Sequence, residues 1–190
     1  MSAFDYILLL LSFVFALALT HLLSRVGELM MARRRVRFSG LQALVIINAI
    51  VQVYLAWLTM WDTRSVRAWD LLTITIFFVF AIGNYFVCVA ASPEIPAEGA
   101  IDMEASYWNN RRLFYGVMVL LSVVSLATNF AFLQTPDTAL FLQSDLLTLP
   151  FFLPSLLAFT VSARWAQWVS GLSLLALSIG WCVIFVGVLR

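Results

Sequence analysis

Hydrophobic residues are grouped along the chain in six runs, each close to the length of a membrane-spanning helix. An α-helix needs about 20 predominantly apolar residues to cross the hydrocarbon core of a bilayer. The first run begins at Phe4, and the other five cover approximately 40–61, 70–91, 111–133, 145–163 and 165–189. The pattern predicts an all-α integral membrane bundle of six transmembrane helices, in a single domain over residues 1–190.

The arginines are divided unevenly between the connections that join these runs. Eight of them follow the first, third and fifth runs or end the first helix: Arg25, Arg33, Arg34, Arg35, Arg37, Arg111, Arg112 and Arg164. The opposite side holds only Arg64, Arg67 and Arg190. Because cytoplasmic segments carry the excess of basic residues, both termini are predicted on the non-cytoplasmic side, and residues 33–37 form a cytoplasmic basic run.

The first run also has features of a cleavable signal. Residues 7–14 are followed by Ala16-Leu17-Ala18, but Asp5 is the only early charge, and a signal needs a basic segment before its apolar region. We therefore expect an uncleaved first span. If its helix continues through Glu28 to Met31, it exceeds the thickness of the bilayer and its last turns lie in the cytoplasm.

The amino-acid composition is typical of a chain that is surrounded by lipid. Hydrophobic residues make up 63% and charged residues 11%, against roughly 45–50% and about 25% in soluble domains. All eleven basic residues are arginine, which excludes Schiff-base chemistry on a lysine. The net charge is +1 and the arginines flank the apolar runs, so no basic surface for nucleic acid is expected. Membrane lipid is the partner that composition predicts.

Polar side chains within the runs mark a candidate site. Asn48 and Gln52 are one turn apart in the second run, Asn84 lies in the third, and His21, the single histidine, lies in the first. Counting about 1.5 Å per residue from the ends of the runs places all four at a similar depth, in the cytoplasmic half of the bilayer. Because amides in lipid need hydrogen-bond partners, we expect one buried polar cluster.

Two interpretations of this cluster are open. In the first, the histidine and the amides hydrogen-bond to one another and hold the helices together, at about 0.6 kcal/mol per bond. In the second, His21 is a proton- or ligand-responsive group, because histidine changes charge close to physiological pH.

The connection at 92–110 is the longest and carries the acidic residues of the cytoplasmic side: Glu94, Glu98, Asp102 and Glu104. It shares that side with the basic run, so we expect the two segments to interact. Asp102 is expected to cap a short helix that leads through Tyr107 and Trp108 into the fourth span. This helix would lie in the headgroup interface or in a solvated linker. A metal site is disfavoured, because no histidine is nearby and no known metal-loop pattern occurs.

Small residues recur at every fourth position of the first run, at Ser12, Ala16, Thr20 and Ser24. Such a stripe allows the close approach of another helix backbone. The neighbour is either another helix of the same chain or one from a second copy of the protein.

Motifs for catalysis and cofactor binding do not occur in the sequence. A single histidine excludes bis-histidine haem within one subunit, and there is no Gly-rich phosphate loop, nucleophile elbow or H-E-x-x-H motif. Cys88 and Cys182 are expected near opposite faces of the membrane, too far apart for a disulfide. We therefore predict no catalytic residue, no metal, no cofactor and no enzymatic activity.

Several segments resemble a family of small, uncharacterised bacterial membrane proteins. They are Phe4-Asp5-Tyr6, Thr20-His21-Leu22-Leu23, the basic run, and Tyr107 with Arg111, Arg112 and Phe114. The resemblance implies a multi-spanning protein of the bacterial inner (plasma) membrane and implies no particular activity.

Two classes of function are compatible with these features. The first is a small oligomeric channel or transport unit, in which the polar faces of the helices line a pathway. The second is a non-catalytic accessory or scaffold subunit of a larger membrane complex. Partners are then lipid and either further copies of the chain or other membrane subunits.

Overall fold

The computed structural model describes residues 3–60, 71–132 and 138–188. Within them the chain folds into six α-helices: α1 (Ala3–Met31), α2 (Gly40–Thr59), α3 (Leu71–Ala91), α4 (Met103–Phe132), α5 (Thr138–Thr160) and α6 (Arg164–Val188). Between α1 and α2 lie a 3-10 turn at Arg33–Arg35 and a short strand, β1 (Val36–Arg37), which pairs in parallel with β2 (Ile101–Asp102). The predicted all-α class is confirmed.

Four stretches of helix are long and apolar enough to cross a membrane: Phe4–Met31, Gly40–Thr59, Leu71–Ala91 and Arg164–Val183. In the described part of α5 the apolar stretch is shorter, at Leu149–Thr160. By the length and composition of its helices, the chain is a multi-pass membrane protein.

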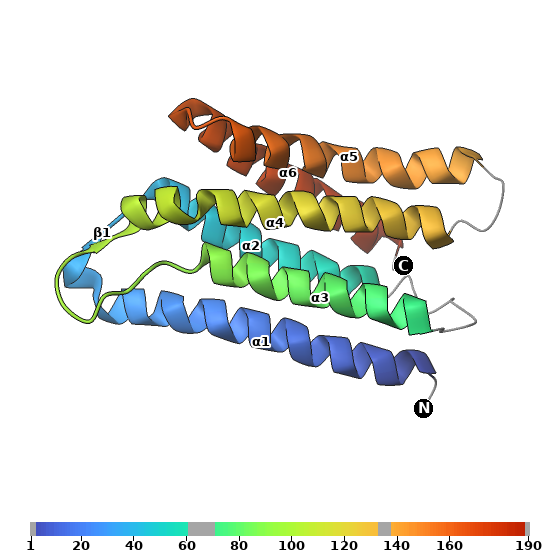
Figure 1. The fold of residues 1–190 in the computed structure, drawn as a ribbon, viewed down its shortest axis with the longest axis horizontal. Helices are drawn as coiled ribbons and strands as arrows, with labels where there is room; N and C mark the ends of the chain where they lie inside the picture. Colours follow the sequence, from blue (N-terminus) through green and yellow to red (C-terminus); the bar gives the residue numbers. More distant parts are fainter. Residues whose placement is uncertain (1–2, 61–70, 133–137, 189–190) are drawn as a thin grey trace.

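The basic run and the chain ends lie at opposite ends of the bundle. α1 begins and α6 ends at one end, and β1 lies at the other (Figure 1). We call the end that holds β1 and the first turns of α2, α4 and α6 the arginine end, because the arginines expected on the cytoplasmic side lie there. The three arginines expected on the opposite side, Arg64, Arg67 and Arg190, are outside the described residues.

α1 is longer than a membrane span, as predicted. Its 29 residues extend over about 43 Å, against a hydrocarbon core of about 30 Å. α4 starts before the predicted span because the Asp102 carboxylate accepts hydrogen bonds from the backbone N–H groups of Glu104 and Ala105, both at 3.0 Å. The predicted cap is thus confirmed, and it starts a continuous helix of 30 residues.

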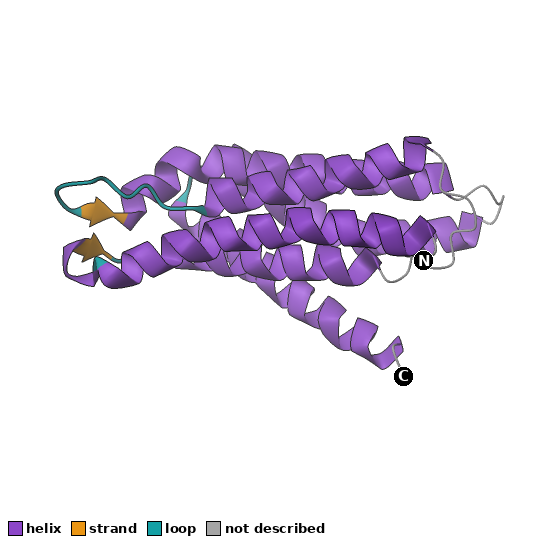
Figure 2. Cartoon of the chain, turned by 90° about the horizontal axis from the view of Figure 1, so that it is seen from below, coloured by secondary structure: helices purple, strands orange, loops and turns teal. Residues whose placement is uncertain are grey.

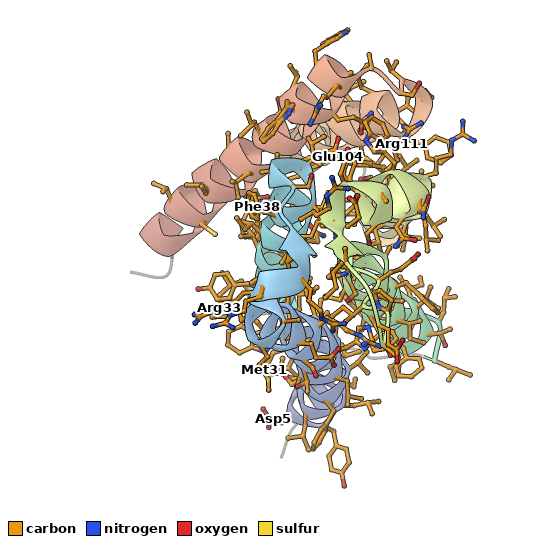
Figure 3. All side chains as sticks on the ribbon, turned by 90° about the vertical axis from the view of Figure 1, so that its left-hand side faces the viewer. Asp5, Met31, Arg33, Phe38, Glu104 and Arg111 are labelled. Atoms are coloured by element: carbon orange, nitrogen blue, oxygen red, sulfur yellow. The ribbon has the colours of Figure 1, made fainter. Side chains whose placement is uncertain are left out.

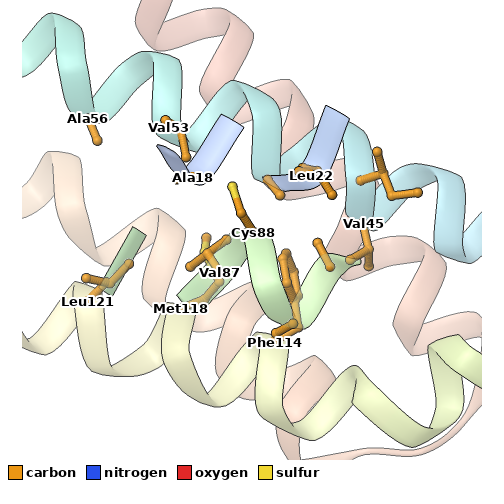
Figure 4. Close-up of a cluster of buried hydrophobic side chains, with 14 of the residues drawn as sticks. Ala18, Leu22, Val45, Val53, Ala56, Val87, Cys88, Phe114, Met118 and Leu121 are labelled. Atoms are coloured by element: carbon orange, nitrogen blue, oxygen red, sulfur yellow. The ribbon is translucent and has the colours of Figure 1, made fainter. Parts of the chain in front are cut away.

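α3 is the central helix and packs against α1, α2 and α4. α4 packs in turn against α5, and α6 packs against α5 and α2. Figure 4 shows Val87 and Cys88 of α3 among Ala18 of α1, Val53 of α2 and Met118 of α4. Because lipid is as apolar as these side chains, close packing holds this core together, and the hydrophobic effect contributes little.

The approach of α6 to α2 depends on Gly171. A Cβ at this position would lie 2.6 Å from Cδ2 of Leu44, so a larger residue would force the Leu44 side chain or one of the helices to shift. The space allows Nδ2 of Asn48 to donate to the Gly171 carbonyl at 3.0 Å, in addition to the Leu44 carbonyl at 2.9 Å. Toward its C-terminal end α6 diverges from the bundle (Figure 2).

The C-terminal end of α5 is capped by side chains from two neighbouring helices. Nη1 of Arg111, on α4, donates to the carbonyl oxygens of Ala158 at 2.7 Å and Val161 at 3.4 Å. Nε2 of Gln167, on α6, donates to the same two carbonyls, at 3.1 Å for Ala158. Carbonyls at the end of a helix have no partner within the helix itself. We call the arrangement of Arg111 and Gln167 on these carbonyls the α5 cap.

Two aromatic residues of α4 support the α5 cap. The Tyr107 hydroxyl donates to Oε1 of Gln167 at 2.6 Å, and the Trp108 ring centroid lies 5.6 Å from Cζ of Arg111. Burial, with a smaller contribution from Tyr115, raises the pKa of Tyr107 well above its ordinary value, so the hydroxyl stays a donor. Arg111 is 5% exposed, and its charge is met by carbonyl dipoles and an aromatic face.

The C-terminal end of α3 is capped in a similar way. Nε2 of Gln42, a buried residue of α2, donates to the Ala91 carbonyl at 2.7 Å. The Ser92 hydroxyl donates to the Cys88 carbonyl at 2.9 Å. Two helices that end at the arginine end therefore depend on side chains from outside for their last hydrogen bonds.

The stripe of small residues on α1 faces away from the bundle. Ala16, Thr20 and Ser24 are exposed, whereas Ser12 accepts a hydrogen bond from Nε1 of Trp57 at 3.3 Å. The stripe is therefore open to lipid or to a second copy of the chain along most of its length.

We expect Arg111→Gln to lower the free energy of unfolding by about 1–3 kcal/mol. A shorter, neutral amide cannot reach both carbonyls that the guanidinium holds, so they lose their charge-assisted hydrogen bonds and keep only those from Gln167. Arg112→Gln is the matched control, because Arg112 is exposed, and its effect should stay within about 0.5 kcal/mol. The measurement is reversible unfolding in detergent micelles, and equal effects of the two variants would contradict the role of the α5 cap.

Candidate functional site

His21 lies in a polar pocket at the arginine end. α1 and α4 both extend beyond the last residue of α3, and the connection from Ser92 to Asp102 crosses the gap between them (Figure 1). The space left beyond the end of α3 is a pocket of about 690 Å³, which we call the notch pocket. Its walls are α1, the end of α3, the crossing connection and the first turns of α4.

Three of these walls contribute polar side chains to the notch pocket. They are His21 and Arg25 from α1, Ser92, Glu94 and Asp102 from the connection, and Ser106, Asn109 and Asn110 from α4. The pocket therefore contains a cation, carboxylates, an imidazole and two amides, a set that can hydrogen-bond to both donors and acceptors.

Some of these groups are already engaged by the protein. Arg25 pairs with Glu28 at 2.9 Å, and the Ser106 hydroxyl accepts a hydrogen bond from the backbone N–H of Glu94 at 3.0 Å. Asp102 is engaged as the N-cap of α4. Within the described parts of the chain, no hydrogen bond engages the side chains of four others: His21, Glu94, Asn109 and Asn110. These four are free to bind a ligand.

The structure does not join His21 to the three amides of the predicted cluster by hydrogen bonds. His21 is half-buried, and its ring lies beside that of Tyr85 on α3, with 6.1 Å between the centroids. Asn48 is turned to α6 through its bond to Gly171. Nδ2 of Asn84 donates to a carbonyl of its own helix, and its Oδ1 is buried without a partner.

Gln52, the fourth predicted member, is half-buried and makes no hydrogen bond to any described residue. The mutual hydrogen bonding expected of the cluster is thus replaced by bonds from the amides of Asn48 and Asn84 to backbone carbonyls. The physical reason is that depth along a helix does not fix the rotation of that helix about its axis. A carbonyl one turn away, four residues earlier, is always within reach of such an amide.

The basic run contacts the acidic connection, as predicted. Nη1 of Arg37 lies 3.5 Å from Oδ2 of Asp102, beside the parallel pairing of β1 with β2. Nη1 of Arg35 donates to the carbonyls of Ala97 at 3.1 Å and of Gly99 at 3.3 Å. Gly99 has a φ of 89°, a conformation that favours glycine. The exposed ion pair contributes only about 0–1 kcal/mol, so the contact orients the connection more than it stabilises it.

The two other arginines of the basic run are not used in this way. Arg33 and Arg34 are exposed, and neither forms a hydrogen bond or ion pair with a residue that the structure describes. Figure 3, which views the arginine end face on, shows Arg33 pointing outward while Glu104 and Arg111 lie at the start of α4. The run thus divides into two residues that hold the connection and two that face the surroundings.

Glu104 links three helices at the arginine end. Its carboxylate accepts hydrogen bonds from the Ser39 hydroxyl before α2 and from Nε1 of Trp108 on α4, both at 3.2 Å. Nη2 of Arg164, the first residue of α6, lies 3.2 Å from the same carboxylate. One acidic side chain therefore sets the start of α2, α4 and α6 relative to one another.

The residues of the α5 cap were not predicted from the sequence. In the sequence, Arg111 is a marker of the cytoplasmic side and part of the family resemblance, and its neighbour Arg112 has both features as well. Gln167 carries the one available signal, because an amide inside an apolar run needs a partner. The sequence does not indicate that this partner is the end of the preceding helix.

The described part of the chain contains no cluster of metal-ligating side chains. No group of three or more histidine, cysteine or acidic side chains there could hold a metal ion. Cys88 and Cys182 are free cysteines. No protein-family model matches the chain, and no curated protein or solved structure is similar enough to match it. The geometry of the chain is therefore the basis on which its function is inferred.

Replacement of Glu104 by alanine should lower the free energy of unfolding by about 1–3 kcal/mol, because the buried Ser39 hydroxyl and the Trp108 N–H both lose an acceptor. Glu98→Ala is the control in the neighbouring connection, where Glu98 is exposed and has no described partner; its effect should stay within about 0.5 kcal/mol. Thermal unfolding of both variants in the same detergent provides the comparison. A Glu104→Ala variant as stable as the parent would show that this carboxylate is dispensable.

Proposed function

We propose that the chain is a six-span protein of the bacterial inner membrane that acts, without catalysis, as an accessory or scaffold subunit of a larger membrane complex. The observation that carries this proposal is that buried amides form hydrogen bonds with neighbouring helices. Three of them donate to carbonyls outside their own helix: Gln42 to Ala91, Asn48 to Gly171 and Gln167 to Ala158. Such bonds hold helices together and occupy donors that a substrate would otherwise use.

A conduction pathway has a different requirement. Polar groups must stay free along the bundle to replace the hydration of a permeant species. Within the described residues, the buried side-chain atoms without a partner are Oδ1 of Asn84 and Oγ of Ser170. Two fully buried atoms on different helices, α3 and α6, are too few to line a pathway by themselves, and this supports the structural role.

The proposed topology has both termini on the non-cytoplasmic side. It is supported by the gathering of arginines at the arginine end, because cytoplasmic segments carry the excess of basic residues. Lipid and other membrane subunits are the partners. The exposed stripe of Ala16, Thr20 and Ser24 on α1 offers a surface for close helix contact, which suits a second copy or another subunit.

A small oligomeric channel or transport unit is the second candidate. The observation that favours it is the notch pocket, which holds His21 and three other unengaged polar side chains at the arginine end. In an oligomer such pockets could receive a substrate from the cytoplasm. The two candidates differ in whether purified protein moves a solute across a membrane by itself.

The topology can be tested with cysteines at two exposed positions, in a background where Cys182 is replaced by serine. Arg34→Cys should react with a membrane-impermeant thiol reagent only after the cells are opened. Asp5→Cys should react in spheroplasts whose inner membrane is intact. Arg34 and Asp5 are both exposed, so a difference in reactivity reports the side of the membrane, and the reverse pattern would overturn the orientation.

The subunit role predicts that purified protein in liposomes shows no solute or proton flux at any pH between about 5 and 8, the range in which histidine changes charge. It also predicts that a photocrosslinker replacing Thr20 forms a discrete adduct in native membranes. The control is the same crosslinker at Leu120 on α4, which is 60% exposed but lies off the stripe. Adducts are identified by mass spectrometry as a second copy or a defined membrane subunit.

Two results would contradict this role. One is pH-dependent flux in the parent that is lost in His21→Gln, which would favour the transport unit. The other is equal labelling at Thr20 and Leu120, which would mean that the stripe contacts only lipid.

A further inference from the structure

The notch pocket carries groups of opposite charge on different walls. His21 and Arg25 come from α1, whereas the Glu94 carboxylate comes from the connection between α3 and α4. Arg25 is paired with Glu28 through Nη1, so its other guanidinium nitrogens keep their donors. The Glu94 side chain is exposed, and nothing in the described residues donates to its carboxylate.

The lining of the notch pocket changes with depth. Val89, in the last turn of α3, and Leu113, farther along α4, line the part nearer the bilayer centre, whereas Glu94 lies beyond the end of α3. Because α3 ends at Ala91, the pocket lies where hydrocarbon gives way to the headgroup layer. A molecule that fills the pocket therefore meets apolar groups on one side and charged groups on the other.

We propose that the notch pocket binds the headgroup of an aminophospholipid, which carries a phosphate and a primary ammonium close together. The phosphate accepts hydrogen bonds from Arg25 and from the amides of Asn109 and Asn110, and the ammonium donates to Glu94. The acyl chains run past Val89 toward the bilayer. The pocket volume of about 690 Å³ is in the range of about 300–1,000 Å³ that small-molecule sites occupy.

Other ligands fit the same groups less well. A purely anionic headgroup would place a second negative charge beside Glu94, and a choline headgroup has no N–H to donate to it. A soluble zwitterion carries the same two charges but leaves the surface around Val89 and Leu113 unfilled. The proposal goes beyond the subunit role and does not depend on it, because binding is measured on the isolated full chain.

The test uses the full chain in detergent after removal of bound lipid. Short-chain phosphatidylethanolamine, phosphatidylcholine and phosphatidylglycerol, and the chain-free compound glycerophosphoethanolamine, are each titrated, and the midpoint of thermal unfolding is followed. A ligand that binds the folded state raises this midpoint. We expect phosphatidylethanolamine to bind about tenfold more tightly than phosphatidylcholine, the difference that one charge-assisted hydrogen bond supplies.

Two pairs of variants locate the binding in the notch pocket. Glu94→Gln should weaken phosphatidylethanolamine binding about tenfold, while Glu98→Gln, in the same connection but outside the pocket, should leave it unchanged. Arg25→Gln should weaken binding to a similar extent, and Arg34→Gln, an exposed arginine outside the pocket, should not. The Glu94 side chain has no described partner, so its variant should fold like the parent and keep the lipid-free unfolding midpoint.

Three outcomes would overturn the proposal. Equal binding of all three lipids would show that the headgroup is not recognised. Undiminished binding by Glu94→Gln would place recognition elsewhere on the protein. Glycerophosphoethanolamine binding as tightly as the lipid would identify a site for soluble zwitterions, in which the acyl chains play no part.

Discussion

Backbone carbonyls at the end of a helix must find hydrogen bonds from outside that helix, and the arrangement of this bundle depends on how they do so at the arginine end. In lipid or at its edge an unpartnered carbonyl is costly, because little water is available to replace the missing donor. Gln42 donates a hydrogen bond to a carbonyl at the end of α3, and Arg111 and Gln167 donate to a carbonyl at the end of α5. These side chains come from α2, α4 and α6, so the hydrogen bonds that cap α3 and α5 also hold the neighbouring helices against them.

The notch pocket is a consequence of unequal helix lengths around this capped end. α1 has 29 residues and α4 has 30, whereas α3, which lies between them, has 21. The connection that crosses the resulting gap is held by Arg35 and Arg37 and by the Asp102 cap. Arginines of the basic run thus also hold the wall of a pocket in place.

Hydrogen-bond partners separate structural from functional polar residues more clearly than position in the sequence does. Asn48 and His21 both lie within apolar runs, yet Asn48 is engaged with α6 while His21 opens into the notch pocket. Arg111 and Arg112 are neighbours, yet only Arg111 is buried and engaged with α5. For a ligand, the informative groups are those without a partner in the protein, and four of them line the notch pocket: His21, Glu94, Asn109 and Asn110.

Features that depend on local composition and order can be predicted from the sequence: the all-α class, apolar runs of spanning length, the extension of α1, the Asp102 cap, and the contact between the basic run and the acidic connection. Each follows from helical geometry, capping chemistry or charge within short segments. The packing of the helices is needed to show that Asn48 turns to Gly171, that Arg111 is buried on the end of α5, and that His21 borders a pocket. These contacts depend on how each helix is rotated about its axis. Close packing between helices sets this rotation, and a run that is hydrophobic on all sides does not specify it.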